Sequence, residues 1–385
     1  MTLAREPRTS PIVPSYGGSS LADLSASVLA SLTGDAAGNV LGLPEHQRVC
    51  VLLIDGLGYE LLRGHQAAAP FLAELAFNSR PLTAGCPSTT VTSLASLGTG
   101  LPPAAHGMLG YQVAVPGEER LLNGLHWPDD IDPAAWQPRP TIFERAAAAG
   151  VTPVHVSRGA FRKSGLTTAA LRGAGYRSAD SLGALAALTA DALGESERTL
   201  VFAYHGDLDA TGHLYGVASA AWYHQLAHVD KLAEQIAASL PYGAIMYVTA
   251  DHGMVDVGPD DRIDADADGS PLRDGVALLG GEPRFRHVYT RPGAADDVLA
   301  TWREVLGERA WVLPREEAVK EGWFGPAGTA VSDVMAPRIG DVVAASAGSW
   351  AVTASQAEPL ESTLIGMHGS LTAAEQLIPL LTPVR

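Results

Sequence analysis

The sequence predicts an α/β fold: an αβα sandwich with a mostly parallel central sheet and a smaller inserted α+β lobe. Two observations predict the sandwich, because apolar runs of strand length recur along the chain and segments of helical pattern separate them. A third observation predicts the lobe, since the stretch after residue 256 becomes acidic and rich in Gly and Pro.

The expected strands of the central sheet are continuous apolar runs. The first is VCVLLI at 49–54, in which apolar residues do not alternate with polar ones. This pattern is typical of parallel strands that helices cover on both faces. The other runs lie at 151–156, 200–203 and 244–250. The helical segments expected around them lie at 21–32, 59–77, 141–149, 182–193 and 220–240.

The smaller lobe is expected over residues 256–340, within a single domain that spans residues 1–385. It opens with VDVGPDDRIDADADGSPLRDG and contains one further helical pattern. The chain then returns to apolar runs at 339–345 and 350–353, and a final helix is expected after Gly369.

Charge and composition limit the classes of partner. The chain has 26 basic and 42 acidic residues, a formal charge of −16. Such a surface repels polyanions, so neither a nucleic acid polymer nor a membrane is an expected partner. No stretch approaches the roughly 18 apolar residues that cross a bilayer, and no signal-peptide core is present. With only two cysteines, nothing requires an oxidising compartment, and we expect a cytoplasmic protein of unspecified oligomeric state.

Carboxylates and imidazoles stand where the apolar runs stop. Ligands of open α/β sheets bind outside the carboxyl ends of the strands, so these groups are expected to converge. The candidates are Asp55, Asp209, His213, Asp251, His252 and His368. Such a set suits two divalent cations, zinc first and manganese or iron as alternatives. Two metals can clamp the attacking and leaving oxygens of a phosphoryl displacement, so a small anionic phosphate ester is the expected partner.

The stretch GCPSTTVTSLASLGTG at 85–100 holds the candidate nucleophile. It is rich in Thr and Ser and begins with a Gly/Pro turn. A hydroxyl at the start of the following helix would meet backbone N–H donors and a dipole that favours an anion. Thr90 is the first choice, and Thr89 is its nearest competitor.

These motifs together resemble the alkaline phosphatase superfamily and, within it, the type I phosphodiesterase/nucleotide pyrophosphatase family. The resemblance rests on the order of the motifs between about residues 49 and 370. They are the Asp-Gly at Asp55, P-S-T-T ending at Thr90, D-A-T-G-H from Asp209 to His213, D-H-G-M from Asp251 to Met254, and the late His-Gly at His368. A Thr-Gly at Thr99 and a His-Gly at His106 also follow the family order.

The resemblance implies an alkaline phosphatase-like sandwich and a role for each matched residue. Asp209, His213 and His368 would hold one metal. The other metal would be held by Asp55, Thr90, Asp251 and His252. Thr90 would attack phosphorus and form a phospho-threonine intermediate that water releases, so that phosphodiester or pyrophosphate bonds of nucleotide-type substrates are cleaved.

One position departs from the family pattern. The family usually has an Asn about twenty residues after the nucleophile that donates to a phosphate oxygen, and here Leu109-Gly110-Tyr111 occupies that place. Either the Tyr111 hydroxyl, the backbone or a nearby amide such as Asn123 would take over.

Basic residues after the second strand are the candidate substrate contacts. Arg158, Arg162 and Lys163 lie close together in an otherwise acidic chain, and Arg forks bind phosphate well. The alternative is a solvated loop. These cations would also favour the rival activity, a phosphomonoesterase; a phosphonate hydrolase and a catalytically silent binding protein are the remaining alternatives.

Overall fold

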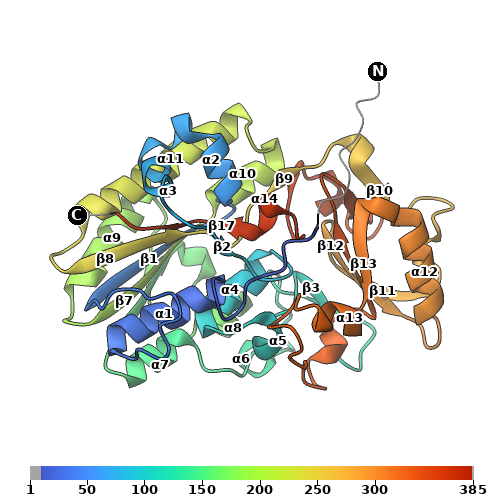
Figure 1. Ribbon diagram of the computed structural model, residues 1–385, viewed down its shortest axis with the longest axis horizontal. Helices are drawn as coiled ribbons and strands as arrows, with labels where there is room; N and C mark the ends of the chain where they lie inside the picture. The colour runs from blue at the N-terminus through green and yellow to red at the C-terminus, as the bar shows by residue number, and fades with distance from the viewer. Residues whose placement is uncertain (1–9, 384–385) are drawn as a thin grey trace.

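A six-stranded sheet forms the centre of the larger part of the molecule (Figure 1). The computed structural model describes residues 10–383. The strands follow the order β18-β8-β1-β7-β5-β6. They are β1 (Arg48–Ile54), β5 (Thr152–Ser157), β6 (Gly175–Ser178), β7 (Thr199–His205), β8 (Ala244–Thr249) and β18 (Leu380–Leu381). All neighbouring pairs are parallel except β18 with β8, so the predicted mostly parallel sheet is confirmed.

Helices cover both faces of this sheet, which completes the predicted αβα sandwich (Figure 1). One layer contains α1 (Leu21–Thr33), α4 (Thr90–Thr99), α7 (Ile142–Ala148) and α8 (Gly165–Leu171). The other layer contains α3 (Pro70–Ala76), α9 (Leu182–Gly194), α10 (Asp207–Tyr215) and α11 (Ala220–Ser239). The single helix expected at 59–77 is wrong: α2 (Tyr59–Gly64) ends early, and α3 begins at Pro70, which has no N–H for a helix interior.

The smaller lobe is built on a four-stranded antiparallel sheet of order β11-β12-β14-β13, with α12 (Ala295–Leu306) packed on it (Figure 1). Its strands are β11 (Val276–Glu282), β12 (Phe285–Thr290), β13 (Ala310–Pro314) and β14 (Val342–Ser346). A further strand, β15 (Ala351–Thr353), pairs with β10 (Arg262–Asp264). The apolar runs after residue 339 therefore continue the lobe. The helix expected after Gly369 is only the short α14 (Ala373–Gln376).

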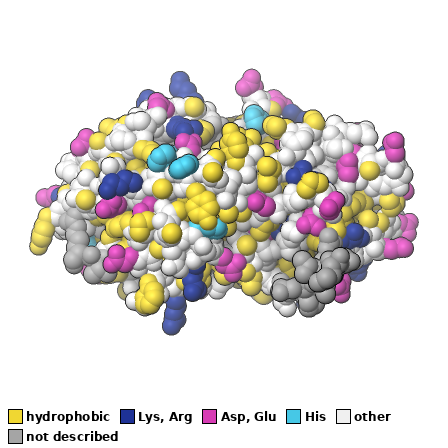
Figure 2. Space-filling view, turned by 90° about the horizontal axis from the view of Figure 1, so that it is seen from above, with side chains coloured by type: hydrophobic (Ala, Val, Ile, Leu, Met, Phe, Trp, Pro, Cys, Tyr) yellow, Lys and Arg dark blue, Asp and Glu magenta, His cyan; other side chains and the backbone are white. Residues whose placement is uncertain are grey.

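Charged side chains of both signs are scattered over one face of the molecule (Figure 2). On the face drawn in Figure 2, Lys and Arg are interspersed with Asp and Glu and do not gather into one basic strip. Within residues 10–383, no helix is long and apolar enough to cross a membrane.

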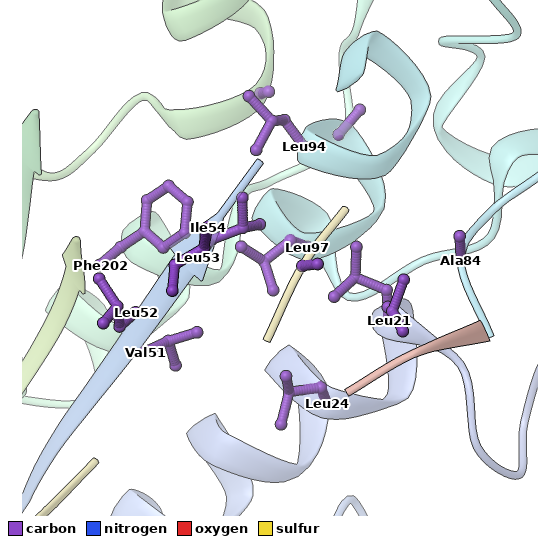
Figure 3. Close-up of a cluster of buried hydrophobic side chains, with 14 of the residues drawn as sticks. Leu21, Leu24, Val51, Leu52, Leu53, Ile54, Ala84, Leu94, Leu97 and Phe202 are labelled. Atoms are coloured by element: carbon purple, nitrogen blue, oxygen red, sulfur yellow. The ribbon is translucent and has the colours of Figure 1, made fainter. Parts of the chain in front are cut away.

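The main hydrophobic core lies between the central sheet and its helices. Figure 3 shows part of it, with side chains from β1, β7, α1 and α4. Six of the seven residues of β1 are buried, as the unbroken apolar run at 49–54 predicts. A second cluster around Trp302 fills the lobe. Phe285, Trp311 and Val343 of the lobe belong to the main core, so the two parts share packing.

A buried ion pair joins the lobe to the larger part. Arg284, between β11 and β12, donates from Nε and Nη2 to the two carboxylate oxygens of Glu375 on α14, at 3.0 and 2.5 Å. Both side chains are fully buried. Glu375 also accepts from the backbone N–H of Ser370, and its own carbonyl accepts from the N–H of Gly253. The pair therefore connects the lobe to the loops that carry His368 and His252.

Replacing Arg284 with methionine is expected to lower the free energy of unfolding by about 3–5 kcal/mol, because the Glu375 carboxylate would stay buried without its cation. Urea denaturation of the wild type and variant measures the difference. The matched control is Lys231→Met, which breaks the exposed pair of Lys231 with Glu234 and is expected to change stability little. An equal effect of both substitutions would contradict the structural role given to the Arg284–Glu375 pair.

Candidate active site

The candidate ligands meet at one edge of the central sheet, where three neighbouring strands end. β1 lies between β7 and β8, so side chains that follow these strands converge. They are Asp55 after β1, Asp209 and His213 on α10 after β7, and Asp251 and His252 after β8. His368 joins them from the loop between β16 (Gly366–Met367) and α14.

One group of candidate ligands consists of Asp55, Asp251 and His252. Their ligand atoms all lie within 4.8 Å of one another, and the three residues are buried. His252 Nε2 lies 3.4 Å from Asp55 Oδ1 and 3.5 Å from Asp251 Oδ2. Thr90 Oγ1 lies 3.3 Å from the same nitrogen. The structure thus brings the candidate nucleophile against this group.

A second group consists of Asp209, His252 and His368, again within 4.8 Å of one another. His213 adjoins it, because its Nε2 lies 3.2 Å from Asp209 Oδ2. The rings of His252 and His368 stack with centroids 3.6 Å apart. His252 belongs to both groups, whereas the family resemblance implied a single metal for it.

The donor atoms left unpaired in these groups fit metal ions. Asp55 Oδ1, Asp209 Oδ1 and Asp251 Oδ2 are buried and have no hydrogen-bond partner among residues 10–383. Buried carboxylate oxygens without donors are unfavourable, and two divalent cations would satisfy them. The carboxylate oxygens and imidazole nitrogens of both groups are ligand atoms that zinc binds.

The histidines are also oriented for this purpose. The Nδ1 atoms of His213, His252 and His368 lie 2.8, 3.0 and 2.9 Å from backbone carbonyl oxygens. Since a carbonyl oxygen only accepts, each Nδ1 carries a proton, and the Nε2 atom of a neutral ring keeps a lone pair. In the neutral form each ring can therefore offer this lone pair to a cation that the carboxylates hold.

Tyr204, on β7, is a residue that sequence reasoning missed. Its hydroxyl donates a hydrogen bond to Asp55 Oδ2. Burial, followed by the charges of Asp251 and Asp209, holds the pKa of Asp55 well above its usual range. Tyr204 partly opposes this rise and leaves Oδ1 as the free oxygen. The contact of Tyr204 with Asp55 follows from the pairing of β7 with β1, and this pairing cannot be deduced from the sequence.

Thr90 is distinguished from Thr89 by its surroundings. Thr90 is the first residue of α4 and is half-buried, while Thr89 precedes the helix and is buried. The Thr89 hydroxyl is hydrogen-bonded to Glu282 of the lobe. The Thr90 hydroxyl instead faces His252 at the N-terminus of a ten-residue helix, where N–H groups attract an anion.

Residues 49–371 match the family described as type I phosphodiesterase / nucleotide pyrophosphatase. The chain belongs to this family. No curated protein matches the sequence.

Several solved structures have a fold similar to that of this chain. Murine ectonucleotide pyrophosphatase/phosphodiesterase 5, as an inactive variant in complex with AMP, has a TM-score of 0.68 and 18% identity over 87% of each chain. The human protein of that name gives the same values. Phosphonoacetate hydrolase from Sinorhizobium meliloti 1021, with phosphonoformate, has a TM-score of 0.66 and 20% identity over 88% of this chain and 90% of its own. These likenesses confirm the alkaline phosphatase-like fold.

Tyr111, in the place of the family's usual Asn, makes its hydrogen bond to a neighbouring carboxylate. The Tyr111 hydroxyl donates to Glu361 Oε1 at 3.1 Å, and burial raises its pKa to about 12. Asn123 lies beside it, and its Oδ1 accepts from the N–H groups of Leu125 and His126. The hydroxyl proton of Tyr111 is thus already used, and its expected contact with phosphate remains a prediction.

A cavity of about 400 Å³ opens beside Thr90, Asp55 and Asp209. Arg158 lines it, but its guanidinium pairs with Asp207 at 2.5 Å. Arg162 and Lys163 are exposed and lie outside the lining of this cavity. Of the three predicted cationic contacts, the structure therefore places one at the cavity.

The metal-free protein is expected to lose stability as the pH rises from about 5 to 9. Burial raises the pKa of Glu282 from 4.5 to about 8. Burial alone would lower the pKa of His213, but Asp209 outweighs it and raises the value from 6.5 to about 9. Both groups bind protons more tightly when folded, so their stabilisation is complete below the unfolded pKa and is lost as pH passes the folded one.

Each of these two protons changes the free energy of unfolding by at most about 1.4 kcal/mol per pH unit. Urea denaturation at several pH values, with chelator and with zinc, measures the slope. Zinc is expected to flatten it, because a bound metal holds the His213 imidazole deprotonated in the folded state. A slope that zinc leaves unchanged would contradict the assignment of His213 as a ligand.

Proposed function

We propose that this chain is a dimetal phosphohydrolase that cleaves phosphodiester or pyrophosphate bonds of nucleotide-type substrates through a phospho-threonine intermediate. The observation that carries the proposal is the placement of the Thr90 hydroxyl, at the start of α4, beside two adjoining groups of candidate metal ligands. Zinc is the metal we propose, with manganese or iron as alternatives.

In this mechanism Thr90 Oγ1 attacks phosphorus and an ester oxygen leaves on the opposite side. Asp55, Thr90, Asp251 and His252 would hold one cation, and Asp209, His213 and His368 the other. When bound, the cations supply Lewis-acid activation and positive charge at the phosphoryl group. The N–H groups at the start of α4 would hold a phosphoryl oxygen. Water then attacks the phospho-threonine and restores the hydroxyl.

Small phosphate esters are the proposed partners. The murine relative was solved with AMP and the Sinorhizobium meliloti relative with phosphonoformate. A monoester carries one more negative charge than a diester. Arg158 is the only Arg or Lys among the described residues that line the cavity, and Asp207 already pairs with it. This supports a diester rather than a monoester as the substrate.

The test compares kcat/KM for bis(p-nitrophenyl) phosphate, p-nitrophenyl phosphate and phosphonoacetate, after chelation and after reloading with zinc. We expect the diester to exceed the other two by at least about tenfold, which corresponds to about 1.4 kcal/mol of transition-state binding. We also expect chelation to abolish turnover. A monoester or phosphonate preference of that size assigns the rival activity, and full activity in chelator excludes the dimetal mechanism.

A further inference from the structure

The cavity beside Thr90 has a polar floor that the proposed chemistry does not use. His155 and Ser157 lie on the same face of β5 and line the cavity. His155 is 2% exposed and pairs in register with Phe202 of β7. The cavity therefore extends from the candidate metal ligands to a buried imidazole.

His155 has no hydrogen-bond partner for either ring nitrogen among the described residues. Its neighbours are aromatic rings: Tyr176 lies edge-on at 4.8 Å and Phe202 at 5.2 Å. A buried imidazole without partners is unfavourable, because it loses its hydrogen bonds to water. Burial lowers its pKa to about 3, so the ring is neutral and has one donor and one acceptor nitrogen.

The walls above this floor are apolar. They are formed by Leu94, Leu125, Phe161, Leu166 and Leu171. Leu125 and Phe161 are 49% and 37% exposed, although both are large apolar side chains. Phe161 is held edge-on against Tyr204 at 6.0 Å. Such walls favour a flat, uncharged group, and the pairing of Arg158 with Asp207 leaves no free Arg or Lys in the lining to attract a charged one.

We infer that this cavity holds a planar heteroaromatic group of the substrate and that His155 recognises the hydrogen-bonding edge of that ring. The inference rests on the proposed function in one respect, namely that the ring is carried by the phosphoryl group that Thr90 attacks. A purely structural histidine would instead fill space between Tyr176 and Phe202, and the enzyme would not distinguish substrate rings of similar size.

The test uses two diesters with the same leaving group: the p-nitrophenyl ester of thymidine 5′-monophosphate and its N3-methyl derivative. Methylation blocks the N–H on the ring edge and leaves the ring itself in place. We expect wild-type kcat/KM to be about tenfold lower for the methylated ester, which is the effect of one hydrogen bond. His155→Phe keeps a flat ring beside Tyr176 and Phe202 but removes both nitrogens, and should bring the ratio of the two esters close to one.

His155→Gln retains a donor and an acceptor, and is expected to keep part of the preference. Wild-type enzyme that does not distinguish the two esters overturns the inference without any variant. A ratio that His155→Phe leaves at its wild-type value also overturns it. If the wild type cleaves neither ester, the proposed function fails. The inference is then decided by calorimetric binding of thymidine 5′-monophosphate and its N3-methyl derivative, with the same tenfold difference expected.

Discussion

Thr90→Ala is expected to lower kcat by at least about 10³-fold while both metals stay bound, because the attacking oxygen is lost and the carboxylates and imidazoles remain. Thr90 is half-buried, and the partner that its hydroxyl leaves, His252 Nε2, is itself a proposed metal ligand. Steady-state turnover of bis(p-nitrophenyl) phosphate and metal analysis of the same preparation measure the two properties.

Two variants make this result specific. Thr90→Ser keeps a hydroxyl at the same place and is expected to recover part of the activity. Thr92→Val, two residues along α4, removes a buried hydroxyl that has no partner among the described residues and keeps the shape of the side chain. It should retain turnover. A Thr90→Ala protein with wild-type kcat would assign the nucleophile elsewhere, with Thr89 the first alternative.

Asp251→Asn is expected to reduce the metal content by one ion per chain and to lower kcat by at least about 10³-fold. Asp251 Oδ2 is the unpaired oxygen, whereas Oδ1 accepts from the N–H groups of Gly56 and His252 at 3.1 and 3.0 Å. The Asn amide oxygen can keep these two bonds. The fold should therefore survive while the ligand oxygen is replaced by a donor that cannot bind a cation.

Mass spectrometric metal analysis after dialysis against buffered zinc measures the stoichiometry. The matched control is Asp207→Asn, which changes a neighbouring carboxylate that pairs with Arg158. It should retain both ions, since Asp207 belongs to neither ligand group. An Asp251→Asn protein that still binds two ions per chain would show that the Asp251 carboxylate is not a ligand.

The inner strands of the sheet could be predicted from the sequence because burial on both faces requires an unbroken apolar run. β1, β5, β7 and β8 all lie within a residue or two of their expected bounds. The edge strands could not be predicted. β6 reads Gly-Tyr-Arg-Ser and is partly exposed, and β18 has only two residues, so pairing with a neighbour decides both. The expected end of the lobe at residue 340 is wrong for a similar reason. The apolar run at 339–345 is compatible with either sheet, and it joins the lobe sheet as β14.

The candidate site was predictable where functional groups closely follow the end of a central strand. The positions of Asp55, Asp209, Asp251 and His252 follow from the order of the strands. The contact of Tyr204 with Asp55 depends on the register of β7 against β1, and that of Glu282 with Thr89 depends on how the lobe docks. Such contacts between distant segments leave no pattern in the sequence.

The ion pair of Arg284 with Glu375 makes the lobe part of the candidate metal centre rather than a hinged lid. An outward swing of the lobe would separate two buried charges and pull on the segments that hold His252 and His368. If the centre binds metal as proposed, metal binding and lobe docking are thermodynamically linked. Each favours the other by the same coupling free energy, so a substitution far out in the lobe can weaken metal affinity without touching a ligand.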